Sequence, residues 1–231
     1  MQTQSGQDLS SERVHIPVDR VTLHGDLVLS SSAGAVVLLP QGIADESLRA
    51  ATARVAESLQ RENFATLSVR LLTPEEEDLD ARTEGMRFDV NLLSRRLIAA
   101  TWWLKDQSAT SKLPIGYFAV STDAAAALVS AADATDLVDA VVAVSGRPDL
   151  AGTAIPHVIA PTLFVVAESD QELLPHNKTA LAALSGEKKL ECIAGTQNLI
   201  EAPEALARTV ELARNWFKTY LLGDRGETRA A

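Results

Sequence analysis

The sequence predicts an α/β fold with a mostly parallel central sheet that carries helices on both faces. Short apolar runs alternate along the chain with longer segments of helical periodicity. Residues 35–39 and 140–144 contain no polar side chain, which is typical of central parallel strands buried on both faces. Strands that alternate with helices imply right-handed crossovers, and they place the ligand crevice at the carboxyl ends of the strands.

The elements follow in order from periodicity and from the residues that break it. Residues 15–18 and 20–29 alternate apolar with polar side chains, which predicts an opening antiparallel pair with one solvated face. Further strands are expected at 35–39, 64–72, 115–120, 137–144, 161–167 and 188–193. Helices are expected at 47–61, 88–105, 124–129, 177–184 and 203–222. The acidic segment 73–78 is expected to be a loop.

One domain is expected over residues 13–222, with disordered tails at 1–12 and 223–231. A chain of 231 residues with 46% apolar content is long enough for one well-developed core. The polar start has no signal-peptide hydrophobic region, and no apolar run approaches the roughly 20 residues of a membrane span. A cytoplasmic setting is therefore expected.

The net charge of −10, with scattered basic residues, argues against nucleic acid and against an anionic membrane surface as partners. Cys192, the single cysteine, permits no internal disulfide, and it is expected to be a buried strand residue. Glu168 and Asp170 have no accompanying histidine cluster, so we expect no metal. No cofactor is expected, and the sequence names no protein partner.

The stretch LPIGYFAVSTDAAAALV at residues 113–129 predicts a strand, a tight turn and a helix around Ser121. In α/β-hydrolases this turn has the sequence G-x-S-x-G and exposes a nucleophilic serine. Here Ala119 and Asp123 stand where the two glycines are expected, so the serine is kept while its small neighbours are not. Thr122 and Asp123 are candidate pocket residues beside it.

In a serine hydrolase of this fold, the loop after the strand at residues 35–39 supplies an N–H to the oxyanion hole, which makes Gln41, Gly42 and Ile43 candidate residues of that hole. Asp45 and Glu46 follow, although carboxylates do not help to bind a developing negative charge. A structural explanation is that both acids occupy the first turn of the next helix, where the helix dipole favours them.

From about Val14 to Leu222 the chain resembles the dienelactone-hydrolase-like branch of the α/β-hydrolases. The resemblance is carried by the stretches LLTPEEEDLDARTEGMRFDVNLL, LPIGYFAVSTDAAAALV, GRPDLAG, APTLFVV and EAPEAL. It implies the α/β-hydrolase fold and a Ser-Asp-His triad that acts on small esters or lactones, with Ser121 as nucleophile and Asp170 as acid. The histidine position of the family falls on Asn198, which cannot take a proton from a serine hydroxyl.

His176 lies in the segment after Asp170 and is the alternative base that we consider, in a displaced triad with Ser121. Two classes of function therefore stay open: a catalytically silent homologue that binds a small molecule or a protein, and a hydrolase of a small ester or lactone that is either slow or uses His176. Ser121 and Asp170 also have structural explanations, because Ser121 or Thr122 can cap the helix after the turn and Asp170 can cap a turn.

Overall fold

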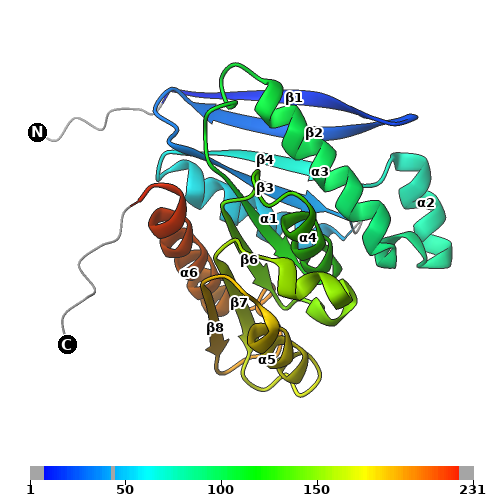
Figure 1. Cartoon of the computed structure of the whole chain (residues 1–231), viewed down its shortest axis with the longest axis vertical. Helices are drawn as coiled ribbons and strands as arrows, with labels where there is room; N and C mark the ends of the chain where they lie inside the picture. The colour runs from blue at the N-terminus through cyan, green and yellow to red at the C-terminus, as the bar shows by residue number, and fades with distance from the viewer. Residues whose placement is uncertain (1–7, 43–44, 224–231) are drawn as a thin grey trace, which may run out of the picture.

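The computed structural model describes residues 8–42 and 45–223, and its eight strands form one sheet in the order β1-β2-β4-β3-β5-β6-β7-β8 (Figure 1). The pairs β1·β2 and β2·β4 are antiparallel, and the other five pairs are parallel. The strands are β1 (Leu9–Val18), β2 (Val21–Ser30), β3 (Ala35–Gln41), β4 (Phe64–Arg70), β5 (Ile115–Val120), β6 (Ala140–Val144), β7 (Thr162–Ala167) and β8 (Lys188–Ile193). The predicted mostly parallel α/β sheet is confirmed.

The helices cover both faces of this sheet. They are α1 (Glu46–Gln60), α2 (Pro74–Thr83), η1 (Met86–Phe88), α3 (Val90–Asp106), α4 (Thr122–Asp133), η2 (Pro148–His157), α5 (Leu173–Ala183) and α6 (Pro203–Leu221). Apolar residues of α1 and α6 form one buried cluster with the sheet, and those of α3, α4 and α5 form the other. The sheet is therefore the middle of three layers, and its parallel strands are buried on both sides (Figure 1).

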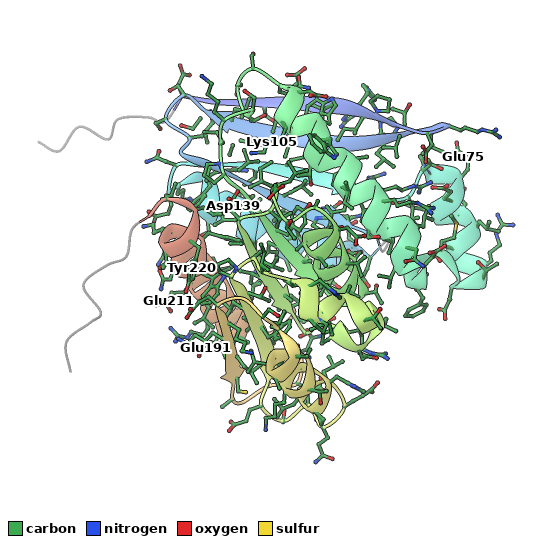
Figure 2. All side chains as sticks on the ribbon, in the orientation of Figure 1. Glu75, Lys105, Asp139, Glu191, Glu211 and Tyr220 are labelled. Atoms are coloured by element: carbon green, nitrogen blue, oxygen red, sulfur yellow. The ribbon has the colours of Figure 1, made fainter. Side chains whose placement is uncertain are left out.

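Strand β5 occupies the centre of the sheet, and polar contacts fix its start. Asp139, labelled in Figure 2, accepts a hydrogen bond from the Ile115 N–H at 2.8 Å. Lys105, also labelled there, donates to the Leu113 carbonyl at 2.9 Å. All six residues of β5 are buried, so the strand delivers its carboxyl end, and Ser121 after it, to a fixed place.

Three expectations from the sequence are wrong. Strand β1 begins at Leu9, so the boundary expected at residue 12 is too late; residues 1–7 and 224–231 lie outside the described part. The acidic segment expected to be a loop starts helix α2, because Thr73 and Glu76 form a capping box and Pro74 occupies the first turn. Cys192 is exposed, since β8 is the edge strand of the sheet.

Helix α2 is held to α3 by a buried arginine. Arg96 is 5% exposed, and its Nη1 donates to the Leu71 carbonyl at 2.7 Å while its Nη2 donates to Glu76 at 2.7 Å. The Arg96 guanidinium holds the pKa of the Glu76 carboxyl below its usual value. One guanidinium therefore connects the end of β4, the capping box of α2 and α3.

Replacing Arg96 tests this connection. Arg96→Met should lower the free energy of unfolding by about 2 kcal/mol, because it leaves a charged acceptor and a buried carbonyl without their donor. The matched control is Arg95→Met on the same helix, where the side chain is exposed, and its effect should stay within about 0.5 kcal/mol. Denaturant unfolding of both variants makes the comparison, and equal losses would contradict this role of Arg96.

Candidate functional site

Ser121 stands at the turn between β5 and α4 in a backbone conformation that few residues other than glycine adopt. Its φ is 57° and its ψ is −128°. The Ser121 N–H donates to the Val144 carbonyl at 3.1 Å, and the Ser121 carbonyl accepts from the N–H groups of Ala124 and Arg147, both at 3.2 Å. The turn therefore has the sharp strand-to-helix geometry of a nucleophile elbow, although both glycines of that motif are replaced.

The hydroxyl of Ser121 is not used to cap the helix. Ser121 occupies the N-cap position of α4 without a side-chain hydrogen bond, and the buried Oγ1 of Thr122 has no partner either. The expectation that one of these side chains caps α4 is wrong. The strained turn is held by its backbone hydrogen bonds and by the packing of α4.

Asp123 takes the place of the second glycine and is 1% exposed. Its Oδ2 accepts a hydrogen bond from the Gly42 N–H at 2.9 Å, which connects residues 81 positions apart in the sequence. A Cβ on Gly42 would lie 2.3 Å from Asp123 Oδ1, so only glycine fits against this carboxyl group. Burial raises the pKa of Asp123 to about 6, and the Gly42 N–H opposes that rise.

Ser121, Asp170 and Asn198 line one open cleft of about 410 Å³, which we call the serine cleft. Its other lining residues come from the start of α1, the ends of β5 and β6, the segment after β7 and the segment before α6: Asp45, Ser47, Leu48, Val120, Ser145, Leu173, Gln197, Ile200 and Glu201. The three positions that resemble a triad therefore meet, as expected of residues that follow the carboxyl ends of parallel strands.

Asp170 and Asn198 both form local turns in the serine cleft. Asp170 Oδ1 accepts from the N–H groups of Glu172 at 3.0 Å and Leu173 at 2.8 Å. The interpretation that Asp170 caps a turn is confirmed. Asn198 Oδ1 accepts from the N–H groups of Ile200 at 3.0 Å and Glu201 at 3.1 Å.

None of the four histidines of the chain lines the serine cleft. His176 lies on α5 and is half-buried, and its charge acts on Asp149 of η2. The pKa of Asp149 is lowered first by the Arg147 side chain and to a lesser extent by His176. His176 therefore lies outside the lining of the serine cleft and acts electrostatically on a carboxylate that does not line it either.

The residues expected at the oxyanion hole and beside it do not lie together in the serine cleft. Gln41 lines a separate cleft, the Gly42 N–H is bound by Asp123, and Thr122 and Asp123 are buried outside the lining of the serine cleft. Ile43 lies outside the described residues.

The acids that follow have the structural role that the sequence indicated. Asp45 is the N-cap of α1 and accepts from the Leu48 N–H at 2.9 Å, and Glu46 is in the first turn. The hydroxyl of Ser47 and this N–H lower the pKa of Asp45. Asp45 also lines the serine cleft, to which it adds a negative charge.

Comparisons with known proteins place this geometry in a family. The chain is 42% identical to a crystal structure of a dienelactone hydrolase from Anabaena variabilis, with a TM-score of 0.88, and the match covers 92% of this chain and 99% of that one. The chain belongs to the dienelactone-hydrolase-like α/β-hydrolases. A dienelactone hydrolase-like promiscuous phosphotriesterase from metagenomic libraries shares the fold, with a TM-score of 0.72 at 16% identity over 93% of this chain and 99% of that one.

A Mycobacterium tuberculosis protein with the provisional name phosphoribosyl transferase is 40% identical over 215 residues. The match covers 93% of this dienelactone-hydrolase-like chain but 48% of that protein, so the chain spans about half of its relative's length. No family model matches the sequence.

The sequence analysis missed two features of this dienelactone-hydrolase-like site. One is the hydrogen bond that joins Asp123 to Gly42, because each residue was considered at its own end of the site. The other is Ser145, which has a φ of 44° and lines the serine cleft directly after β6. Its position after a predicted strand was the available signal. Within the described ranges, no group of three or more His, Cys, Asp or Glu side chains is placed to hold a metal ion.

The turn at Ser121 should store measurable strain. Ser121→Gly should be more stable than Ser121→Ala by about 1 kcal/mol, because both variants lose the hydroxyl but only glycine adopts this φ without cost. Ser130 of α4 is the matched position, where the order should reverse because alanine is favoured in a helix interior. Chemical unfolding measures both pairs, and an alanine variant at 121 as stable as the glycine variant would rule out the strain.

Asp123 should make stability depend on pH. Its folded pKa of about 6 lies above the ordinary 3.8, so the folded state favours the protonated carboxyl and stability falls as the pH rises from about 4 to above 6. The loss is at most about 3 kcal/mol. Asp123→Asn should abolish this fall, while Asp133→Asn at an exposed position of the same helix should keep it. The free energy of unfolding, measured at several pH values, tests this prediction. A pH dependence in Asp123→Asn equal to that of the wild type would contradict the attribution to Asp123.

Proposed function

We propose that this chain is a catalytically silent dienelactone-hydrolase-like protein whose serine cleft binds a small uncharged molecule, such as an ester or a lactone, without hydrolysing it. The observation that carries the proposal is Asn198, which lines the same cleft as Ser121 and Asp170. An amide has no basic lone pair at neutral pH, so it cannot accept the proton that a serine must lose in order to attack a carbonyl.

The hydrogen bonds of the cleft support this proposal. Asn198 Oδ1 is engaged by two backbone N–H groups, and Asp170 Oδ1 is engaged by two others. These bonds hold the turns in place without an imidazole between the two side chains. The fold therefore keeps the shape of the cleft while the group that activates the nucleophile is replaced.

The charge of the lining indicates which ligands the cleft favours. Asp45, Asp170 and Glu201 line it, and among the described residues no lysine, arginine or histidine does. Carboxylates repel an anionic ligand, so a neutral ligand is favoured. Leu48, Leu173 and Ile200 provide apolar contact area beside the polar groups.

The second candidate is an active serine esterase or lactonase with His176 as base. The conformation of Ser121 favours it, because the elbow is kept and the Ser121 hydroxyl makes no cap hydrogen bond. The position of His176 outside the lining of the serine cleft counts against it. Transferase activity does not follow from the M. tuberculosis relative, because more than half of that protein lies outside the match.

The setting of this binding function is proposed to be the cytoplasm. In the part of the chain that the structure describes, no helix has both the length and the apolar character needed to cross a membrane. No nucleic acid is expected at an acidic cleft.

Hydrolysis of an activated aryl ester, together with labelling by a fluorophosphonate, tests the proposal. The wild type should show no turnover and no labelling beyond Ser121→Ala. Asn198→His should raise Ser121-dependent turnover by at least about 10³-fold, because it returns a base beside the nucleophile. Gln197→His, one residue away in the same lining, should leave turnover unchanged.

Turnover by the wild type that disappears in Ser121→Ala would refute the proposal that the chain is catalytically silent. If that turnover also disappears in His176→Ala, while the folded structure is retained, the esterase alternative holds. Saturable binding of a small ester to the wild type, measured by ligand-detected NMR, completes the test of the binding half of the proposal.

A further inference from the structure

A second cleft, of about 360 Å³, lies where the exposed side of β1, β2 and β4 meets the start of α1. Arg13, Arg49 and Arg70 line it together with Gln41, Ser68 and Asp26, and we call it the arginine cleft. Its volume is in the range of small-molecule sites. None of these residues lines the serine cleft.

Strand register brings the polar groups of the arginine cleft to the same face of the sheet. Gln41 and Arg70 are partners across the parallel pair of β3 and β4. Ser68 precedes Arg70 by two residues on β4, so both side chains point to one face, and its partner on β2 is Asp26. Strands therefore place Gln41, Ser68, Arg70 and Asp26, and helix α1 adds Arg49.

Some N–H donors of Arg49 and Arg70 are not satisfied by the nearby carboxylate of Glu77. Arg49 Nη2 donates to Glu77 Oε1 at 2.9 Å, but the buried Arg49 Nε has no hydrogen-bond partner. Arg70 Nη1 lies 4.0 Å from Glu77 Oε2, which is too far for a hydrogen bond. The unpartnered Nε shows that Glu77 does not satisfy every donor of the Arg49 guanidinium.

Two neutral donors are also free. The side chains of Gln41 and Ser68 make no hydrogen bond among residues 8–42 and 45–223. Glu77 is 14% exposed and lies behind the arginines, where it orients Arg49. The amide and the hydroxyl add directional contacts to the charge of the arginines.

The arginine cleft is rich in positive charge, although the chain as a whole is negatively charged. The whole sequence carries −10, whereas three arginines and His24 line this cleft, and the ion-pair partners of the arginines in the described part of the chain are Asp26 and Glu77. Guanidinium groups bind carboxylate and phosphate through paired N–H donors. We propose that the arginine cleft is a binding site for the oxyanion, either carboxylate or phosphate, of a small molecule.

This site is independent of the proposed function of the serine cleft. The first residues of α1 separate the two: Asp45, Ser47 and Leu48 line the serine cleft, whereas Arg49 lines the arginine cleft. Each cleft can therefore be occupied or disabled without the other.

Amide chemical shifts during titration with inorganic phosphate, and separately with malonate, test the proposal at constant ionic strength. Saturable shifts should centre on Gln41, Ser68 and Arg70, and the tighter of the two probes identifies the oxyanion. Arg70→Gln should weaken binding about tenfold or more. Arg208→Gln removes an equal charge from α6, where Arg208 pairs with Glu211, and should leave binding unchanged.

Ser68→Ala keeps every charge and should weaken binding severalfold, so the proposal stays testable if Arg70→Gln folds poorly. Shifts that never saturate, or an equal loss in Arg208→Gln, would show general charge attraction and overturn the site. Shifts centred on Ser145 and Asn198 would move the anion to the serine cleft and overturn it as well. Labelling of Ser121 is a separate readout, so failure here leaves the silent-enzyme proposal untouched.

Discussion

The close crossing of β5 and α4 at Ser121 is the constraint on which the rest of the site depends. A residue with a φ of 57° and a ψ of −128° is held against a cost of about 1–3 kcal/mol. Small side chains allow the crossing: Ala124 to Ala127 are all buried, and a Cβ on Gly146 would lie 2.7 Å from that of Ala124. The elbow is thus fixed by packing between the sheet and the helix, and this packing does not require a catalytic base. The geometry of the elbow alone therefore shows the fold of the chain and does not show activity.

The same packing explains how an aspartate is tolerated at the second glycine position. Asp123 points away from the serine cleft and uses the Gly42 N–H as its partner. Its other oxygen, Oδ1, has no partner, so the cost of burying the carboxylate is only partly offset and the pKa of Asp123 is raised. The exchange gives the fold a contact between the end of β3 and α4, and it removes one N–H of the loop after β3 from any other use.

The sheet and the convergence of the site were predictable because burial and chain direction leave a clear signal. The apolar runs gave β5 and β8 with the bounds that the structure has, and parallel strands bring Ser121, Asp170 and Asn198 to one edge. Helix α2 was missed because its acidic residues lack apolar periodicity, and its stability comes from caps and from Arg96. Cys192 was misjudged because an edge strand and a central strand can have similar sequences.

The side-chain directions at the end of β3 were also beyond the sequence. Alternation along β3 turns Gln41 toward α1 and the arginines, while Gly42 faces Asp123. Gln41 and Gly42 are adjacent in the sequence, yet Gln41 lies beside arginines and Gly42 lies beside a carboxyl group. A motif comparison assigns both residues to one oxyanion loop, and only the structure shows that they face different groups.

The turns at Asp170 and Asn198 have a structural cause of their own. Each Oδ1 accepts hydrogen bonds from two backbone N–H groups, and without these side chains water would have to replace those bonds. Asparagine forms such a turn well, so Asn198 orders the segment before α6. The structural role of each side chain is therefore complete without an imidazole between them, and it does not depend on whether the cleft catalyses a reaction.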